Sequence, residues 1–204
     1  MRKPPPCARR LEKKLYTMET VIFYCEWLPL PKLDFSILTM IAEQGGEFCG
    51  NYSDMCRYLS VTPQNRNRKA IQSAMESLAS KNYITWEQQG RTHHLTIIPK
   101  EREIALPREG VLSVLRHDYS TENVSRAQVL KVFMWIAQNK IEIVTNQMIA
   151  DAIGVSVSTV VSAKNVLERE YENITKKRIS EKIDDDFYIN LGQKLAACAW
   201  WNEI

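Results

Sequence analysis

The chain has 204 residues, of which 45% are hydrophobic and 25% charged, and a net charge of +3. This composition is typical of a globular protein with a packed core and does not favour extensive disorder. No run of about 18 apolar residues is present, so the sequence predicts no transmembrane helix, and no apolar stretch closely follows the basic N-terminus, so it predicts no signal peptide. The mild basic excess permits nucleic-acid binding without arguing for it alone.

The cysteines and histidines do not form a disulfide framework or a zinc-binding pattern. There are five cysteines, an odd number, and no two are spaced as Cys-x-x-Cys. His93, His94 and His117 do not give the HxxxH spacing expected of zinc ligands on a helix. We therefore expect reduced thiols, a cytoplasmic location, and no metal or other cofactor.

Residues 1–19 predict a flexible basic tail, because three consecutive prolines there disfavour helix and strand. The tail is either a solvated chain end or a segment that lies along DNA phosphates. Residues 20–28 are rich in β-branched and aromatic side chains, and they predict a short strand. This strand begins a domain that we expect to extend over residues 20–100.

Within this domain, apolar residues at helical spacing predict a helix over residues 33–44, which a Gly-Gly pair ends. A short strand is expected at 47–49, followed by a second helix that ends near Leu59. Pro63 is well placed to start a third helix, which runs to about Ser80. The remaining part of the domain is a predicted β-hairpin, with strands at 83–88 and 91–99.

A connector is expected over residues 101–124, with one short helix that starts at Pro107. The same order of elements then recurs over residues 125–204, about 94 residues further along the chain. Helices are predicted at 126–140, 146–153 and 156–171, and a short strand is predicted at 141–144 between the first two. Its predicted hairpin has strands at 174–182 and 187–191, on either side of three aspartates at 184–186.

Both copies have the order of elements of a winged helix, namely helix, short strand, helix, turn, helix and two-stranded hairpin. The repetition strengthens the prediction, because each copy supports the other. The predicted fold class is therefore α+β, mainly α, with two winged helix-turn-helix domains in tandem.

The second copy, MIADAIGVSVSTVVSAKNVL, resembles the helix-turn-helix signature. Ala150 is small where two helices should cross closely, and Gly154 provides the positive φ that the turn needs. Polar residues of the third helix should face outward, where they can bond to bases or phosphates. These candidate DNA contacts are Ser156, Ser158, Thr159, Ser162 and Asn165. Because this face is neutral, contact with another protein is the alternative.

In the first copy, the third helix has a longer polar start. Its apolar stripe begins at Ile71, ten residues after Val61, whereas the second copy needs only five residues from Val155 to Val160. The first turns should therefore project beyond their own core. The candidate DNA contacts there are Gln64, Arg66, Asn67, Arg68, Lys69 and Ser73. A charged helix start can also be plain solvated surface.

Basic residues on the predicted hairpins are further candidates, namely Arg91 and His93 on the first and Lys176 and Lys177 on the second. A basic wing either contacts the DNA backbone or minor groove or protects an edge strand from aggregation.

No enzymatic motif is present, because the sequence contains no GxxxxGK[ST], GxSxG or HExxH. The three aspartates are best explained as a hairpin tip. Trp200 and Trp201 either pack on the second domain or form a dimer patch. We therefore expect a protein without enzymatic activity.

The two-copy layout over 33–99 and 125–191 resembles tandem winged-helix replication initiators of plasmids. Residues 50–78, GNYSDMCRYLSVTPQNRNRKAIQSAMESL, are similar to the helix-turn-helix of replication and regulatory proteins of phages and mobile elements. The resemblance implies a bacterial cytoplasmic protein that binds double-stranded DNA at repeated sites, with host replication proteins as further partners. Transcriptional regulation is the alternative, and a winged-helix adaptor for protein contacts is a third hypothesis.

Overall fold

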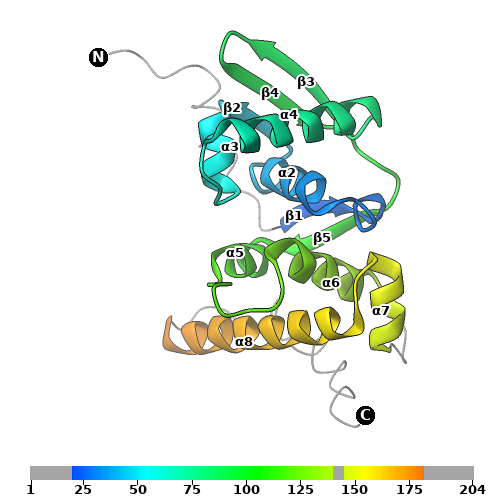
Figure 1. Ribbon diagram of the computed structural model, residues 1–204. Coiled ribbons are helices and arrows are strands. Elements are labelled where there is room, and N and C mark those ends of the chain that lie inside the picture. The colour runs from blue at the N-terminus through cyan, green and yellow to red at the C-terminus, as the bar shows by residue number, and fades with distance from the viewer. Residues whose placement is uncertain (1–19, 140–144, 182–204) are drawn as a thin grey trace. The chain divides into compact units, whose positions relative to one another are not determined.

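The computed structural model describes residues 20–139 and 145–181, with side chains as far as Asn173. This part of the chain is α+β and mainly helical, with two small antiparallel sheets (Figure 1). The chain divides into two compact units, Met1–Arg108 and Glu109–Ile204. None of the described helices is long and apolar enough to cross a membrane.

The first unit confirms the order of elements predicted for residues 33–99. After the Gly-Gly pair, Asn51 caps the second helix: its side chain accepts from the backbone N–H groups of Ser53 and Asp54, and the Asp54 carboxylate accepts from the Asn51 N–H. The elements of this unit are β1 (Thr20–Tyr24), η1 (Cys25–Trp27), α2 (Lys32–Glu43), β2 (Glu47–Gly50), α3 (Tyr52–Tyr58), α4 (Asn65–Ser80), β3 (Ile84–Gln89), β4 (Thr92–Ile97) and β5 (Glu103–Pro107).

Strands β2, β4 and β3 form an antiparallel sheet in that order. The β3–β4 hairpin closes through a two-residue turn, Gly90–Arg91, and Gln89 pairs with Thr92 across it. Gly90 has φ +62°, the conformation that two-residue hairpin turns require. The turn therefore carries the Arg91 side chain at the tip of the hairpin.

Helix α2 lies at the centre of this unit, since most of its residues are buried. It packs against α4 and against both sheets. The buried face of α4 consists of the four residues that the sequence predicted, namely Ile71, Ala74, Met75 and Leu78. This packing holds the second half of α4 firmly and leaves its first half outside the core.

Two predictions at the edges of the first unit were wrong. The strand expected over 20–28 ends at Tyr24, and a short 3-10 helix follows. The expected connector contains β5, which pairs with β1 so that Leu106 lies opposite Val21. Ile104 and Leu106 are buried and Ala105 is exposed, so β5 shows the alternation of a strand with one face in a core.

The second unit contains α5 (Arg108–Arg116), α6 (Arg126–Gln138), α7 (Asn146–Ile153) and α8 (Val157–Glu181). Helices α6 and α7 pack on α8. The sequence predicts that Ile149, Ile153, Val155, Val160 and Leu167 fill the space between these helices. Four of them are buried, and Val155 is half-buried.

The predicted hairpin of the second unit was wrong in its first strand, because α8 continues as a helix to Glu181. Lys176 and Lys177 thus lie on a helix and not on a wing. Residues 172–181 contain no glycine or proline to end the helix, and the lysines and arginine favour helix. Other predicted features lie outside the described residues, namely the tail 1–19, the strand 141–144, the aspartates 184–186, the strand 187–191, and Trp200 and Trp201.

The pairing of β5 with β1 predicts that Leu106→Ala destabilises the first unit by about 2–5 kcal/mol, because it leaves a cavity under the two strands. Urea unfolding followed by circular dichroism, together with faster amide exchange in β1, measures this loss. Ala105→Ser on the exposed face of β5 should change stability by less than about 0.5 kcal/mol. Equal stability of both variants and the wild type would show that β5 is not part of this core.

Candidate nucleic-acid interface

The first half of α4 contributes no buried residue to the core of the first unit. Residues 65–70 include no buried residue, and Ile71 is the first that is buried. At 1.5 Å per residue, these six residues amount to about 9 Å of helix. By contrast, α8 begins at Val157 and already buries Val160. The structure thus confirms the polar extension of α4.

Local hydrogen bonds hold the start of α4 in place. The side-chain amide of Asn67 donates to the Thr62 carbonyl at 2.9 Å, and the Arg68 N–H donates to the Gln64 carbonyl at 3.0 Å. Asn67 is half-buried, whereas Gln64, which precedes the helix as its N-cap residue, is exposed. Asn67 therefore stabilises the turn before α4, and its amide is already used there.

The side chains of the cations on this extension make no hydrogen bond or ion pair with any described residue. Arg66, Arg68 and Lys69 are all exposed, and the first turn of α4 carries no acidic residue. Other arginines do pair with carboxylates, as Arg108 does with Glu43 at 2.6 Å. Three cations near a helix N-terminus oppose the helix dipole. An anion bound at this end would offset that repulsion.

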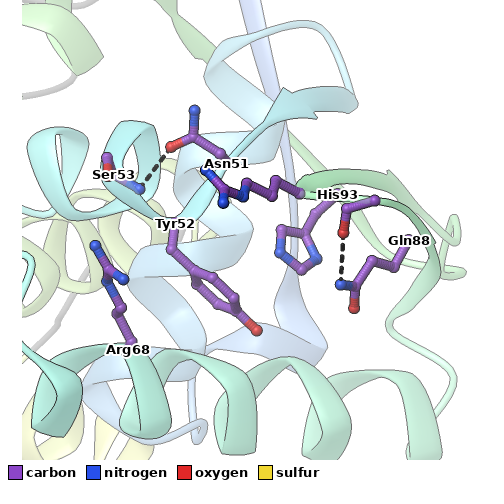
Figure 2. Close-up of a pocket in the computed structure, with 8 residues that line it drawn as sticks. Asn51, Tyr52, Ser53, Arg68, Gln88 and His93 are labelled. Carbon is purple, nitrogen blue, oxygen red and sulfur yellow. Dashed lines mark hydrogen bonds between the residues drawn. The ribbon is translucent and has the colours of Figure 1, made fainter.

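The hairpin tip brings Arg91 toward the same end of α4. Arg68 and Arg91 both line an open pocket of about 560 Å³, which also includes residues from the start of α3. Figure 2 shows Arg68 extending from α4 toward α3, with the ring of Tyr52 between Arg68 and His93. The pocket therefore joins three elements that are separate in sequence, namely α3, α4 and the hairpin.

His93, which the sequence predicts as a DNA contact on the wing, is not on the exposed surface of the hairpin. The residue is only 1% exposed, its Nδ1 accepts a hydrogen bond from the Trp86 indole N–H at 3.1 Å, and its ring lies 4.4 Å from that of Tyr52. Burial, and secondarily the neighbouring His94, lowers the pKa of His93. The alternation of β4 places His93 on the inner face of the sheet. From there its side chain lines the pocket.

The outer face of α4 carries Arg66, Lys69 and Ser73, as predicted. These residues follow at intervals of three and four, which places them on one side of the helix. All three are exposed. They form the polar strip of α4 that can contact a ligand together.

The predicted contacts of the second unit are arranged differently. The Ser156 hydroxyl lies 2.8 Å from the hydroxyls of Ser158 and Thr159 and accepts from the Thr159 N–H at 3.1 Å, so these groups cap the start of α8. Asn165 is exposed and Ser162 is half-buried. The only lysine or arginine in the first eight residues of α8 is Lys164, which is buried and bonds to Asn146.

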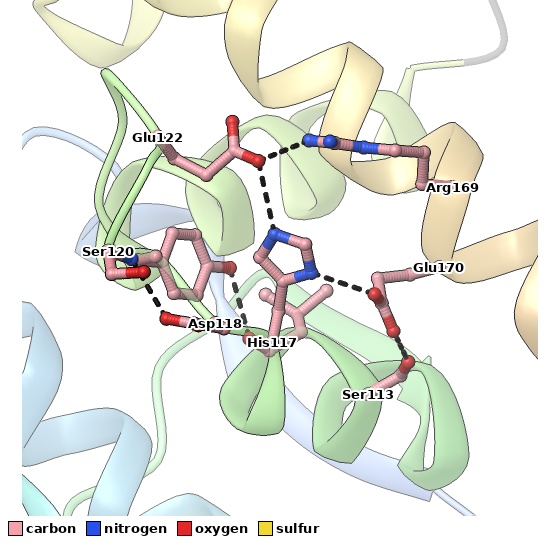
Figure 3. Close-up of polar contacts among 9 residues, drawn as sticks. Ser113, His117, Asp118, Ser120, Glu122, Arg169 and Glu170 are labelled. Atoms are coloured by element: carbon pink, nitrogen blue, oxygen red, sulfur yellow. Dashed lines mark hydrogen bonds and ion pairs between the residues drawn. The ribbon is translucent and has the colours of Figure 1, made fainter.

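A polar cluster of the second unit joins α5, α8 and the loop before α6 (Figure 3). His117 lies between Glu170, at 2.8 Å from Nδ1, and Glu122, at 3.4 Å from Nε2. The hydrogen bond from Arg169 lowers the pKa of the Glu122 carboxyl. The Ser113 hydroxyl bonds to Glu170 and not to the histidine, so the cluster lacks the serine–histidine contact of a hydrolase. The cluster therefore links α5 and α8 to the loop before α6 through hydrogen bonds.

The chain matches no known protein family, no curated protein and no solved structure. Among the described residues, no three histidine, cysteine or acidic side chains come together as a metal site. The arguments on function therefore rest on the geometry of α4 and the hairpin.

The lowered pKa of His93 predicts a pH-dependent stability of the first unit. The unfolded chain takes up a proton on this histidine near pH 6.5, whereas the folded chain resists it until the pH is lower. Stability should therefore be full above about pH 6.5 and decrease as the pH falls toward the folded pKa. Urea midpoints between pH 7 and pH 5 measure the decrease.

Two variants separate His93 from the other groups that titrate in this range. His93→Gln keeps an acceptor for Trp86 but does not titrate, so its urea midpoint should decrease less than that of the wild type. His94→Gln, on the opposite face of β4, should retain the decrease. If the urea midpoint of His93→Gln decreases between pH 7 and pH 5 as much as that of the wild type, His93 is not the group responsible.

Proposed function

We propose that the chain binds double-stranded DNA in a sequence-specific manner, with α4 of the first unit as the helix that enters the major groove. The observation that carries this proposal is the polar extension of α4, where Arg66 and Lys69 are exposed and unpaired among the described residues. A protein surface that serves only solubility does not need about one and a half helical turns beyond its core.

The dimensions of the extension agree with this role. The major groove is about 12 Å wide and 8.5 Å deep, and the free part of α4 is about 9 Å long. An arginine or lysine in the groove bonds guanine O6 and N7, and a serine bonds several bases. The strip of Arg66, Lys69 and Ser73 can therefore provide both affinity and sequence discrimination.

Both units contain the same turn between their two consecutive helices, which supports two winged helices in tandem. Ser60 and Gly154 occupy this turn with φ of 55° and 70°. The N–H of the next residue donates to the Cys56 carbonyl at 2.9 Å in the first unit and to the Ala150 carbonyl at 3.0 Å in the second. The β3–β4 hairpin provides the wing of the first unit.

Contact with another protein is the second candidate, and it is favoured for the second unit. The large exposed apolar residues of that unit, Met148, Val157 and Val161, lie on α7 and the start of α8, where the first unit has its cations. An apolar, neutral surface is suited to a protein partner, such as a second copy of the chain or a host replication protein. The adaptor hypothesis extends this assignment to the whole chain.

We further propose that the DNA binding serves the replication or maintenance of a bacterial plasmid or another mobile element, in the cytoplasm and without enzymatic activity. The tandem layout supports this role. Transcriptional regulation is the alternative. An array of repeated sites beside the coding region favours replication, whereas a divergent promoter favours regulation.

The proposal predicts that Arg66→Ala with Lys69→Ala weakens duplex binding at least about tenfold. The slope of log binding constant against log salt concentration should also decrease in magnitude by up to about two, if both side chains contact phosphates in addition to bases. The duplex is one selected by the wild-type protein from a random pool. Gel shifts over a range of salt concentrations measure both quantities.

The matched control is Lys32→Ala with Lys81→Ala, which removes two exposed cations of the first unit. Lys81 follows the last residue of α4, at the end opposite to Arg66. This control should bind within about twofold of the wild type, because surface charges away from the contact act only weakly through screened solvent. Equal binding by both double variants would refute the assignment of α4, and failure to select any duplex would favour the adaptor hypothesis.

A further inference from the structure

We propose that the pocket between α3, α4 and the β3–β4 hairpin binds one phosphate group of the DNA backbone. This inference rests on the proposed function and deepens it, because it assigns a phosphate contact to a defined site. The pocket is open and about 560 Å³ in volume, and none of its eight lining residues is acidic. An open site suits a phosphate that remains attached to a strand.

The hydrogen-bond chemistry of His93, a lining residue of the pocket, leaves a donor on its Nε2 atom. The Trp86 indole can only donate, so the Nδ1 atom that accepts from it carries no proton. In a neutral imidazole the remaining proton is then on Nε2. His93 is 1% exposed and lines the pocket, and its Nε2 makes no hydrogen bond with a described residue. Trp86 thus fixes the tautomer that can donate to an oxyanion.

Two arginines from different elements complete the site. Arg68 comes from α4 and Arg91 from the hairpin tip, and neither is paired with any described residue. Arginine is well suited to phosphate because its planar group donates two parallel hydrogen bonds to two oxygens. The lining of one pocket thus combines two cationic side chains from different elements with His93.

The position of Arg68 favours backbone phosphate over a free anion. Consecutive helical residues are about 100° apart, so Arg68 points to the side of α4 opposite Arg66 and about a quarter-turn from Lys69. It therefore cannot share the groove-facing strip and instead lies toward α3, as Figure 2 shows. A phosphate bound there belongs to a strand that flanks the groove occupied by α4. Such a contact fixes the register of the helix on the duplex.

The test uses full-length protein labelled with ¹⁵N-histidine, whose His93 Nε2 resonance reports on the pocket directly. The chain has three histidines, so each signal can be assigned by single substitution. The probes are inorganic phosphate and the selected duplex. The variants are Arg68→Ala with Arg91→Ala, and the control Lys32→Ala with Lys81→Ala.

We expect both probes to shift the His93 Nε2 signal in the wild type and in the control. In the arginine variant, the same concentrations should produce no shift, and duplex affinity should decrease at least about tenfold. The slope of log binding constant against log salt concentration should decrease in magnitude by about one and not two, because both arginines contact a single phosphate. A His93 signal that neither probe shifts, or one that shifts equally in the arginine variant, would overturn the inference.

The outcomes also separate this inference from the proposed function. If the duplex binds through Arg66 and Lys69 but leaves the His93 signal unchanged, the function stands and the pocket assignment fails. If inorganic phosphate shifts the signal but no duplex binds, the pocket is a site for free anions, and the assignment to DNA backbone is overturned together with the function.

Discussion

The arrangement of the first unit depends on where the apolar stripe of α4 begins. Burial of Ile71, Ala74, Met75 and Leu78 against α2 and α3 fixes the direction of the helix. Because the stripe starts only at Ile71, the same packing that holds the helix projects its first turns outward. The hydrophobic contacts of one half thus position the charges of the other half, so the cations do not rely on loop flexibility for their placement.

Each unit contains two consecutive helices joined by a tight turn, α3–α4 in the first and α7–α8 in the second, and the two units differ in what they expose. In the first, the helix after the turn begins with cations, and a hairpin adds Arg91 beside them. In the second, the corresponding helix begins with hydroxyl groups that cap it and with the exposed side chains of Val157 and Val161. The two surfaces therefore differ in chemistry, one cationic and the other neutral and partly apolar.

Local signals were sufficient to predict most of the first unit. Helical spacing of apolar residues, the Gly-Gly pair and Asn51 located α2, β2 and α3, and the comparison of the two copies revealed the polar start of α4. The prediction was wrong where non-local contacts decide. β5 was missed because its alternation has meaning only opposite β1. The predicted third helix of the second copy was too short because Ile174 and Thr175 favour strand locally, whereas α8 continues through them.

The sequence by itself determined the order of elements, the inward faces of the helices and the set of cations available to an anionic partner, because helical periodicity and turn chemistry are local properties. Only the tertiary structure decided which of these side chains can act together. Pairing of β3 with β4 brings Trp86 to His93 and removes that histidine from the surface. The hairpin also brings Arg91 to the same pocket as Arg68. Arg68 and Arg91 are far apart along the chain, and their proximity depends on sheet register and helix packing, which no local pattern specifies.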